Sequence, residues 1–338
     1  MSKCNRFALH GAIISFCMSL CLCSHSQKTV IRGFADLLAT YEKNKTSFGF
    51  GEQDLFITSE LNDRLSFLGE SVFKFTLGTP TNFSVSIERL YVKYNIAGNH
   101  SILFGKQHTP INYWNATYHH GRVFFPTIER PLLFAANLIP LHTTGVTLQG
   151  HDLGSIKFGY DLMIGNGIGS GEITDNDKYK SVTAAAYIKP ANRLQLGITY
   201  YNDVISKGAS VHGHTVDWKV YQQILTASAV YFGNKFEFLS ESSLANNYTD
   251  TTGSRNSFFT YLYAGFKIKE KFVPYFRLDY MYFPDGEIYF DKDNTTSFIG
   301  GMRYQINYIA VIKLEYQHKE SEMLGSSNRI TFQFAIGF

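Results

Sequence analysis

The sequence contains no cysteine beyond residue 26. Its four cysteines all lie in the first 23 residues, as Cys4, Cys17, Cys21 and Cys23. This absence excludes a disulfide framework and a thiolate metal site from the rest of the chain. The same part of the sequence also lacks an apolar run of the roughly 20 residues that a transmembrane helix needs.

Charged residues, proline and tryptophan are also scarce. Only 17% of the residues are charged, whereas a soluble domain usually has about 25%. The net charge is +3, so no basic field indicates a nucleic-acid partner. In contrast, 29 phenylalanines and 22 tyrosines bring the aromatic share to 16%. This composition is typical of a membrane β-barrel with aromatic girdles at its two interfaces with water.

The N-terminus has the three parts of a secretory signal peptide. Lys3 and Arg6 are basic, an apolar run follows over residues 7–22, and Ser24 and Ser26 are small residues at the positions that a signal peptidase reads. We therefore expect residues 1–26 to be a signal peptide, cleaved after Ser26, and residues 27–338 to form one domain.

Two other interpretations of this segment are weaker. A retained anchor would need a run of about 20 apolar residues, and this run has about 15. A lipoprotein would need a small residue before the modified cysteine, but Leu20 and Leu22 precede Cys21 and Cys23.

The C-terminal ten residues alternate strictly between apolar and polar side chains. One face carries Ile330, Phe332, Phe334, Ile336 and Phe338. Period-two alternation predicts a strand with one apolar face. A terminal aromatic strand resembles the signal by which the barrel assembly machinery recognises outer-membrane barrels, with Phe338 as its last residue. The alternative is a half-buried last strand of a soluble sandwich.

Similar alternation recurs along the chain and predicts an antiparallel barrel of about 16 strands, the even number that single-chain bacterial barrels have. Helices are excluded there because apolar residues two apart cannot share a helical face. In the segment 83–96 the alternation changes phase at Glu88-Arg89, which predicts a β-bulge. The expected strands are 30–41, 52–61, 65–77, 83–96, 100–107, 142–150, 154–164, 179–189, 193–203, 219–232, 235–244, 256–268, 271–283, 295–304, 308–318 and 328–338.

The connections between these strands alternate between short and long. The short joints, expected on the periplasmic side, are 62–64, 97–99, 151–153, 190–192, 233–234, 269–270 and 305–307. The long joints, expected outside the cell, are 42–51, 108–141, 165–178, 204–218, 245–255, 284–294 and 319–327, while 78–82 is short. This asymmetry is a barrel property that a soluble sandwich does not predict.

Taken together, the strand count, the loop order and the terminal Phe338 resemble the 16-stranded porin superfamily, both the general and the phosphate-selective type. The resemblance covers the whole chain after the signal peptide, although the acidic Pro-Glu-Phe-Gly-Gly segment of general porins is absent. It implies that the third loop, residues 108–141, folds into the lumen and narrows it. It also implies an outer-membrane location in a Gram-negative bacterium, contact with outer-membrane lipid and assembly as a homotrimer.

The third loop is too aromatic to extend freely into water, so we expect it to pack against the inner wall. Its fixed charges are mainly Arg122 and Arg130 against Glu129. A cationic excess in a narrow constriction favours anions, which predicts a weak anion preference. In the alternative, Glu129 and Arg130 pair locally and the arginines hold the loop to the wall. The expected constriction residues are Lys106, His119, His120, Arg122, Glu129 and Arg130.

The function that these features predict is passive diffusion of small polar solutes or ions, without a cofactor and without a reaction. The polar faces of the strands would line the water-filled lumen. The expected lining residues are Arg32, Asp36, Lys74, Lys157, Asp161, Arg277, Asp279, Arg303, Lys313 and Glu315. The alternatives are a barrel enzyme such as a lipid-modifying hydrolase, and an adhesion or structural barrel with a plugged pore.

Two motifs indicate other chemistry only weakly. The histidine pairs His119-His120 and His212-Gly-His214 have no cysteine or regularly spaced carboxylate to complete a metal site. The glycine-rich segment 165–171 follows a strand but precedes no helical pattern, so it lacks the helix N-terminus of a phosphate-binding loop. We expect neither a metal nor a nucleotide.

Overall fold

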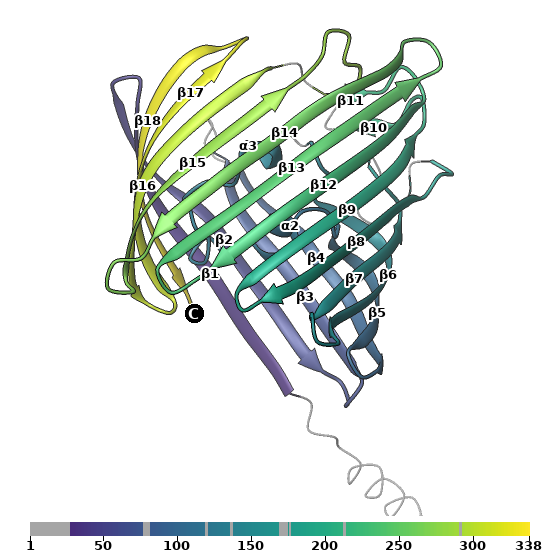
Figure 1. Ribbon diagram of the computed structural model, residues 1–338, viewed down its shortest axis with the longest axis horizontal. Coiled ribbons are helices and arrows are strands. Elements are labelled where there is room, and N and C mark those ends of the chain that lie inside the picture. The colour runs from purple at the N-terminus through teal and green to yellow at the C-terminus, as the bar shows by residue number, and fades with distance from the viewer. Residues whose placement is uncertain are drawn as a thin grey trace, which may run out of the picture.

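A computed structural model describes residues 28–76, 82–118, 121–135, 138–168, 175, 177–211, 214–290 and 293–338. Sixteen strands of this described part close into one antiparallel barrel (Figure 1). The expected signal peptide lies outside the described residues. The wall consists of β1 (Lys28–Glu42), β2 (Lys45–Glu60), β3 (Leu65–Thr76), β4 (Asn82–Ala97), β5 (His100–His108), β6 (His142–Leu153), β7 (Phe158–Gly165), β8 (Ser181–Ala191), β9 (Leu194–Ile205), β12 (Val220–Phe232), β13 (Phe236–Thr249), β14 (Gly253–Phe266), β15 (Phe272–Tyr282), β16 (Thr295–Asn307), β17 (Ala310–Ser321) and β18 (Gly325–Gly337).

Each strand of the wall pairs with its neighbours along the chain, and β1 pairs with β18 to close the barrel. Phe338 completes this seam, because its backbone N–H donates to Gly33 O and its carbonyl accepts from Gly33 N, both at 2.9 Å. The all-β barrel class and the strand number predicted from alternation are therefore confirmed.

The two faces of the wall differ as the alternation predicts. In β18, Ile330 and Phe332 are more than 40% exposed on the outside, whereas Thr331 and Gln333, which alternate with them, are buried inside. The other exposed apolar side chains include Phe48, Phe104, Ile164, Phe236 and Tyr308. The predicted bulge is also present: Arg89 lies opposite Glu70 and Ile87 opposite Ser71, which leaves Glu88 as the extra residue.

Three of the connections predicted to be long are short hairpin turns, so the predicted asymmetry between the two ends is wrong at these joints. β1 and β2 continue to the tip at Lys43 and Asn44, which have positive φ angles of 50° and 61°. This is the conformation of a two-residue hairpin that matches the strand twist. The joints 250–252 and 322–324 are short in the same way.

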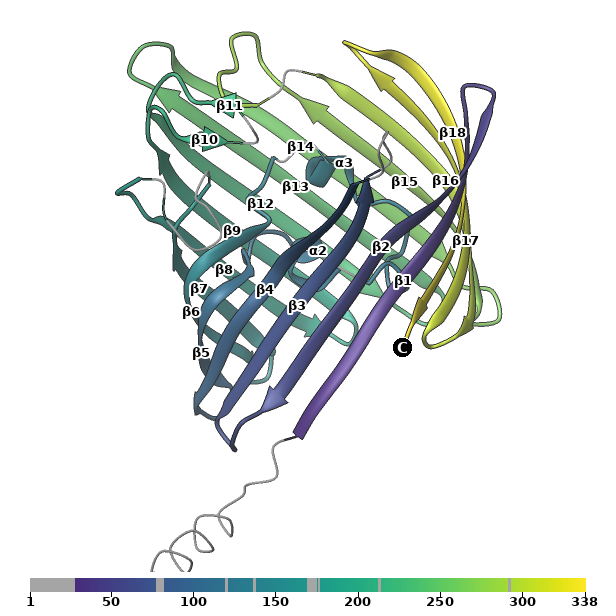
Figure 2. The same cartoon turned by 180° about the vertical axis from the view of Figure 1, so that it is seen from behind.

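Four connections at this end are long: residues 109–141, 166–180, 206–219 and 283–294. The third of them carries the small sheet of β10 (Ser210–Val211) and β11 (His214–Thr215). Residues 109–141, named here the lumen loop, contain the short helices α2 (Tyr113–Thr117) and α3 (Leu132–Ala135). Both helices lie inside the barrel in two opposite views (Figures 1 and 2).

The lumen loop packs on the inner faces of β12 to β16, where it forms the largest apolar core of the molecule. Because a sheet wall needs apolar partners on this face, the loop takes the place that a second layer has in a soluble protein. The buried loop residues of this core are Ile111, Trp114, Phe125, Leu133, Phe134, Leu138 and Ile139, and the wall residues include Ile224, Leu239, Phe259, Tyr261, Tyr263 and Ile299.

Candidate functional site: the lumen and its loop

The base of the lumen loop is tied by backbone and amide hydrogen bonds. Thr109 N donates to Leu141 O at 3.1 Å, which brings the two ends of the loop together. The buried Asn115 amide donates to the same two stretches, to Thr109 O at 2.8 Å and Leu141 O at 3.0 Å. The loop therefore enters and leaves the barrel wall at one point, between β5 and β6.

Carboxylates of the inner wall accept backbone N–H groups of the loop. Glu241, on β13, accepts from Trp114 N at 3.0 Å and also from Tyr113 N. Glu315, on β17, accepts from Ile128 N at 2.7 Å. All these carboxylates are buried, so each hydrogen bond to a charged group is stronger than a neutral one.

Cations of the same wall donate to the oxygens of the loop. Lys313 Nζ donates to Arg122 O at 2.6 Å and to Thr127 O at 3.0 Å. Arg277 donates to Thr127 Oγ1 and to Glu129 O, both at 2.6 Å. The wall thus satisfies the carbonyl groups of an irregular segment that would otherwise be buried without partners.

Four of the expected pore-lining residues therefore have another environment than predicted. Arg277, Asp279, Lys313 and Glu315 point into the barrel, but all are at most 4% exposed beneath the lumen loop. Arg277 and Asp279 also pair with each other at 2.9 Å. The alternation gives the correct face, but it cannot show that a loop covers that face.

Arg303 is also largely covered: it pairs with Glu237 at 2.8 Å and donates to Pro126 O at 3.1 Å. Lys74 differs, since its side chain is 44% exposed on the inner face and lies 3.7 Å from Glu88. Of the six lining residues predicted on β3, β15, β16 and β17, Lys74 is the one that reaches open space inside the barrel.

The two loop arginines lie beside acidic residues of the wall. Arg122 is within 3.7–3.8 Å of Asp36, Glu52 and Glu129, and Arg130 pairs with Glu52 at 3.0 Å. This cluster contains two cations and three carboxylates. The cationic excess predicted from the loop sequence is therefore offset by Asp36 and Glu52, and the arginines join the loop to β1 and β2.

Lys106 does not belong to the constriction. It lies opposite Leu90 and Thr144, on the outer face that it shares with Phe104, and its ammonium group donates to Ile87 O. The position of a residue at the entry of a loop does not fix the face to which it points. The expected constriction residues His119 and His120 lie outside the described part of the chain.

Of the remaining predicted lining residues, Asp161 on β7 pairs with His151 at 3.0 Å on the inner face. Lys157 lies in the turn between β6 and β7, with a φ angle of 48°, and not on a strand. Arg32 is exposed on β1, whereas Asp36 is 4% exposed and accepts from Glu52 N at 2.9 Å.

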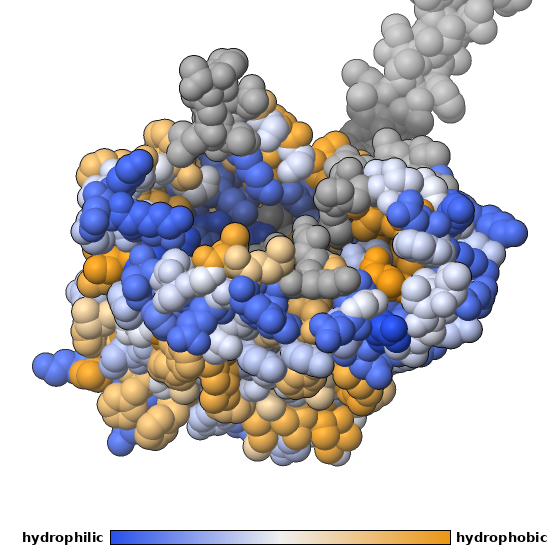
Figure 3. All heavy atoms as spheres, turned by 90° about the horizontal axis from the view of Figure 1, so that it is seen from above, coloured by the Kyte–Doolittle hydropathy of each residue, from blue (hydrophilic) through white to orange (hydrophobic). Residues whose placement is uncertain are grey.

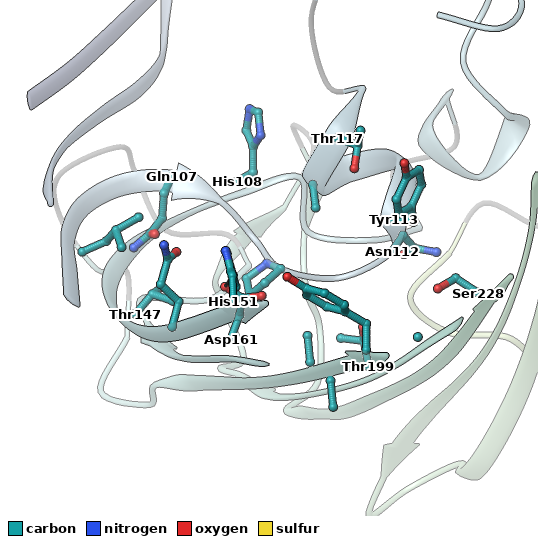
Figure 4. A pocket seen from close by; sticks show the side chains of 18 of the residues that line it. Gln107, His108, Asn112, Tyr113, Thr117, Thr147, His151, Asp161, Thr199 and Ser228 are labelled. Atoms are coloured by element: carbon teal, nitrogen blue, oxygen red, sulfur yellow. Dashed lines mark hydrogen bonds and ion pairs between the residues drawn. The ribbon is translucent and has the colours of Figure 1, made fainter. Parts of the chain in front are cut away.

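In the described part of the chain, a cavity lies on each of two sides of the lumen loop. One, of about 380 Å³, lies between α2 and the inner faces of β4 to β9 (Figure 4). The second, of about 540 Å³, lies where the lumen loop approaches the loop ends of β1, β17 and β18, beside Arg122 and Glu129. The loop end of the barrel is hollowed and surrounded by hydrophilic side chains (Figure 3).

Sequence reasoning missed Glu241, Glu52 and Glu237 as parts of the site. For two of them a signal is present in the sequence. Glu237 and Glu241 are four residues apart in the expected strand 235–244, so they lie on the same face of the strand, and this face points into the barrel. Charge alternation does not show which inward carboxylates meet a loop and which meet water.

No group of three or more potential metal ligands occurs among the described residues. No helix in the described ranges is long and apolar enough to cross a membrane. The histidine pairs considered above are not tested by this result, because His119, His120 and His212 lie outside the described ranges.

Solved structures of outer-membrane proteins have a similar fold. An anion-selective porin of Comamonas acidovorans superposes with a TM-score of 0.67 at 10% identity, covering 93% of this chain and 100% of that one. The trimer form of OmpT, an outer membrane protein of Vibrio cholerae, has a TM-score of 0.66 at 13% identity, with coverages of 92% and 99%. The outer membrane channel DcaP of Acinetobacter baumannii has a TM-score of 0.61 at 15% identity, with coverages of 93% and 98%.

These likenesses bear on the fold: the chain forms the closed 16-stranded barrel of the outer-membrane porins, as the resemblance in sequence pattern predicts. No family model matches the chain, and no curated protein matches it.

Proposed function

We propose that this protein is an outer-membrane channel through which small polar solutes and ions diffuse passively. One observation carries the proposal: the barrel has an apolar outer face, and cavities with polar side chains in their lining remain on both sides of a loop that is fixed inside it. A loop that only plugged the barrel would need no polar space on either side. Such a wall meets hydrocarbon outside and encloses water.

The test of this proposal is swelling of liposomes that contain the purified protein. Sugars of increasing size should enter at decreasing rates, with a cut-off set by the space beside the lumen loop. Liposomes that do not swell in any of these sugars, although the protein in them is folded, would favour the plugged structural barrel instead.

The channel preference for ions should be weak. Two cations and three carboxylates meet around Arg122, so their charges nearly cancel. The anion preference expected from the loop sequence alone is therefore not part of this proposal. The Comamonas acidovorans porin is anion-selective, but this is a property of that protein alone.

We propose a homotrimer in outer-membrane lipid, assembled through the barrel assembly machinery with Phe338 as part of the signal. Support for the trimer comes from the similarity of fold to a protein solved as a trimer. Chemical crosslinking in native outer membranes should give a trimer band. If crosslinking gives only a monomer band, the proposed trimer is contradicted.

Cleavage of residues 1–26 belongs to the same proposal, because β1 begins at Lys28, immediately after the expected new N-terminus at Gln27. Intact mass of the protein from outer membranes measures the cleavage site directly. We further propose that the barrel has no catalytic role. Covalent labelling by a serine-directed probe would contradict this and favour the hydrolase.

A further inference from the structure

The cavity between α2 and β4 to β9 has the character of a binding site. Its volume of about 380 Å³ lies within the range of about 300–1,000 Å³ of small-molecule sites. Gln107 and Thr147 lie on the strand side, and Asn112, Tyr113 and Thr117 lie at the helix (Figure 4). The cavity is therefore formed jointly by the fixed lumen loop and by the wall opposite its core.

The charged side chains of this cavity, Arg89 and Asp161, each have a polar partner on the barrel wall. Arg89 pairs with Glu70 across β3 and β4, and Asp161 lies 3.0 Å from His151. A charged solute therefore meets charged groups that already have partners, and it would lose hydration on entry. This favours an uncharged occupant.

Three polar side chains of the lining are nine-tenths buried and each keeps one polar atom unused. These atoms are Gln107 Nε2, Asn112 Oδ1 and Thr147 Oγ1, and none of them has a hydrogen-bond partner among the described residues. Their residues are 5%, 4% and 3% exposed, and all three line the cavity. An unmade hydrogen bond of a buried group costs about 1–3 kcal/mol, so these groups favour an occupant that offers both donors and acceptors.

Tyrosine rings complete the lining beside these polar groups. Tyr91, Tyr113 and Tyr187 all contribute to the cavity, as do the amides Gln149 and Gln195. A tyrosine offers a flat apolar face and a polar hydroxyl group at its end. A ring with C–H groups on its faces and hydroxyl groups around its edge matches both features.

We propose that this cavity is a binding subsite for an uncharged polyhydroxylated solute, a sugar or sugar alcohol, that pauses there during passage. Gln107 would donate to a solute hydroxyl, Asn112 would accept from one, and Thr147 would do either. The inference deepens the proposed function and rests on it, since the solute reaches the cavity only through the channel.

The test is a titration of single channels of the full barrel in planar bilayers with D-glucose and sucrose. The current should fall saturably with sugar concentration. In the double variant Gln107→Leu and Thr147→Val, the half-saturating concentration should rise roughly tenfold or more, because two hydrogen bonds of about 1 kcal/mol each are lost. The matched control is Thr331→Val, which removes a buried inward hydroxyl on β18, outside the lining of the cavity, and it should leave the titration unchanged.

Charged sugars of similar size provide the second comparison. Gluconate and glucosamine should reduce the current only at much higher concentrations than glucose. Equal affinity for charged and neutral sugars, a linear response without saturation, or a double variant that titrates like the wild type would each overturn the subsite. A folded protein that carries no current at all would instead overturn the proposed function.

Discussion

The inner face of this barrel uses its charged residues mainly to hold a loop. Glu241 and Glu315 accept loop N–H groups, and Lys313 and Arg277 donate to loop oxygens. Because an irregular segment cannot satisfy its own backbone groups, the wall must provide these partners when the loop is buried. The same side chains would otherwise set the charge of the pore.

Removal of the charge of Glu241 should loosen α2. In Glu241→Gln, one side-chain oxygen becomes an NH₂ donor that cannot accept from Tyr113 N or Trp114 N, so the end of the helix loses a hydrogen bond to a charged group, worth about 1.5–3 kcal/mol. Trp114 is fully buried, whereas Trp218, the other tryptophan, is 44% exposed.

Fluorescence in a Trp218→Phe background therefore reports on Trp114 alone. We expect a red shift and faster quenching by acrylamide in Glu241→Gln. The control is Glu60→Gln, at an exposed position at the turn end of β2. An unchanged Trp114 spectrum would show that Glu241 does not hold the helix.

Arg277 is expected to be the most costly of these side chains to remove. In Arg277→Met, the buried Asp279 loses its partner at 2.9 Å, and Thr127 and Glu129 lose their donor. Breaking a buried ion pair by removal of one partner costs about 3–5 kcal/mol. Urea unfolding in lipid vesicles should show that the free energy of unfolding decreases by this amount. A decrease of less than about 1 kcal/mol would contradict the assigned role.

At the scale of elements, the seam of the barrel contains a close contact between a glycine and the last residue. A Cβ atom at Gly33 would lie 2.4 Å from the ring of Phe338, which packs over this glycine beside the β1–β18 pairing. By contrast, a Cβ atom at Gly49 on β2 meets nothing within 4 Å. A larger side chain therefore has room at Gly49 but not at Gly33, although both glycines lie on strands.

Gly33→Val should impair closure, whereas Gly49→Val should be tolerated. Overpacking of a tight contact costs about 1–3 kcal/mol, and here the ring of Phe338 must move away from the seam. Folding into detergent micelles, followed by electrophoresis without heating, measures the folded fraction of each variant. Equal folded fractions for the two variants would show that the ring does not need the space above Gly33.

The existence of the strands can largely be predicted from the sequence, but their lengths cannot. Alternation gives all sixteen barrel strands and the bulge at Glu88. It misses the extension of β1 and β2 to the Lys43-Asn44 tip, because residues 42–47 are all polar and only Phe48 and Phe50 mark an apolar face in the rest of the segment. A strand beyond the hydrocarbon needs no such face, so periodicity ends before the hydrogen bonds do.

At the scale of the whole molecule, the interior of the described part holds an apolar core and cavities beside it. The lumen loop and the β12 to β16 wall form the core, and the polar cavities lie toward β1 to β9 and above the loop. The aromatic composition of the loop predicts that it is buried. The composition does not predict which part of the wall the loop packs against. That depends on contacts between particular residues, such as the ring contact of Trp114 with Tyr261, and no local sequence pattern shows such contacts.

The balance of charge around the loop predicts a small reversal potential. Two arginines and three carboxylates nearly cancel, so a tenfold KCl gradient should give a potential close to zero. In Glu52→Gln, one of these carboxylates is removed beside both arginines, and the potential should shift toward anion selectivity. A shift toward cations, or strong anion selectivity of the wild type, would contradict this balance.

We propose that water fills a continuous path beside a loop that is fixed to one side of the barrel. Single-channel recording with added poly(ethylene glycol) tests it most directly. We predict steady conductance steps that decrease when small polymers enter the lumen and recover as the polymers become too large to enter. Folded protein that gives no steps, or steps that even large polymers reduce as in a barrel without an inner loop, would contradict it.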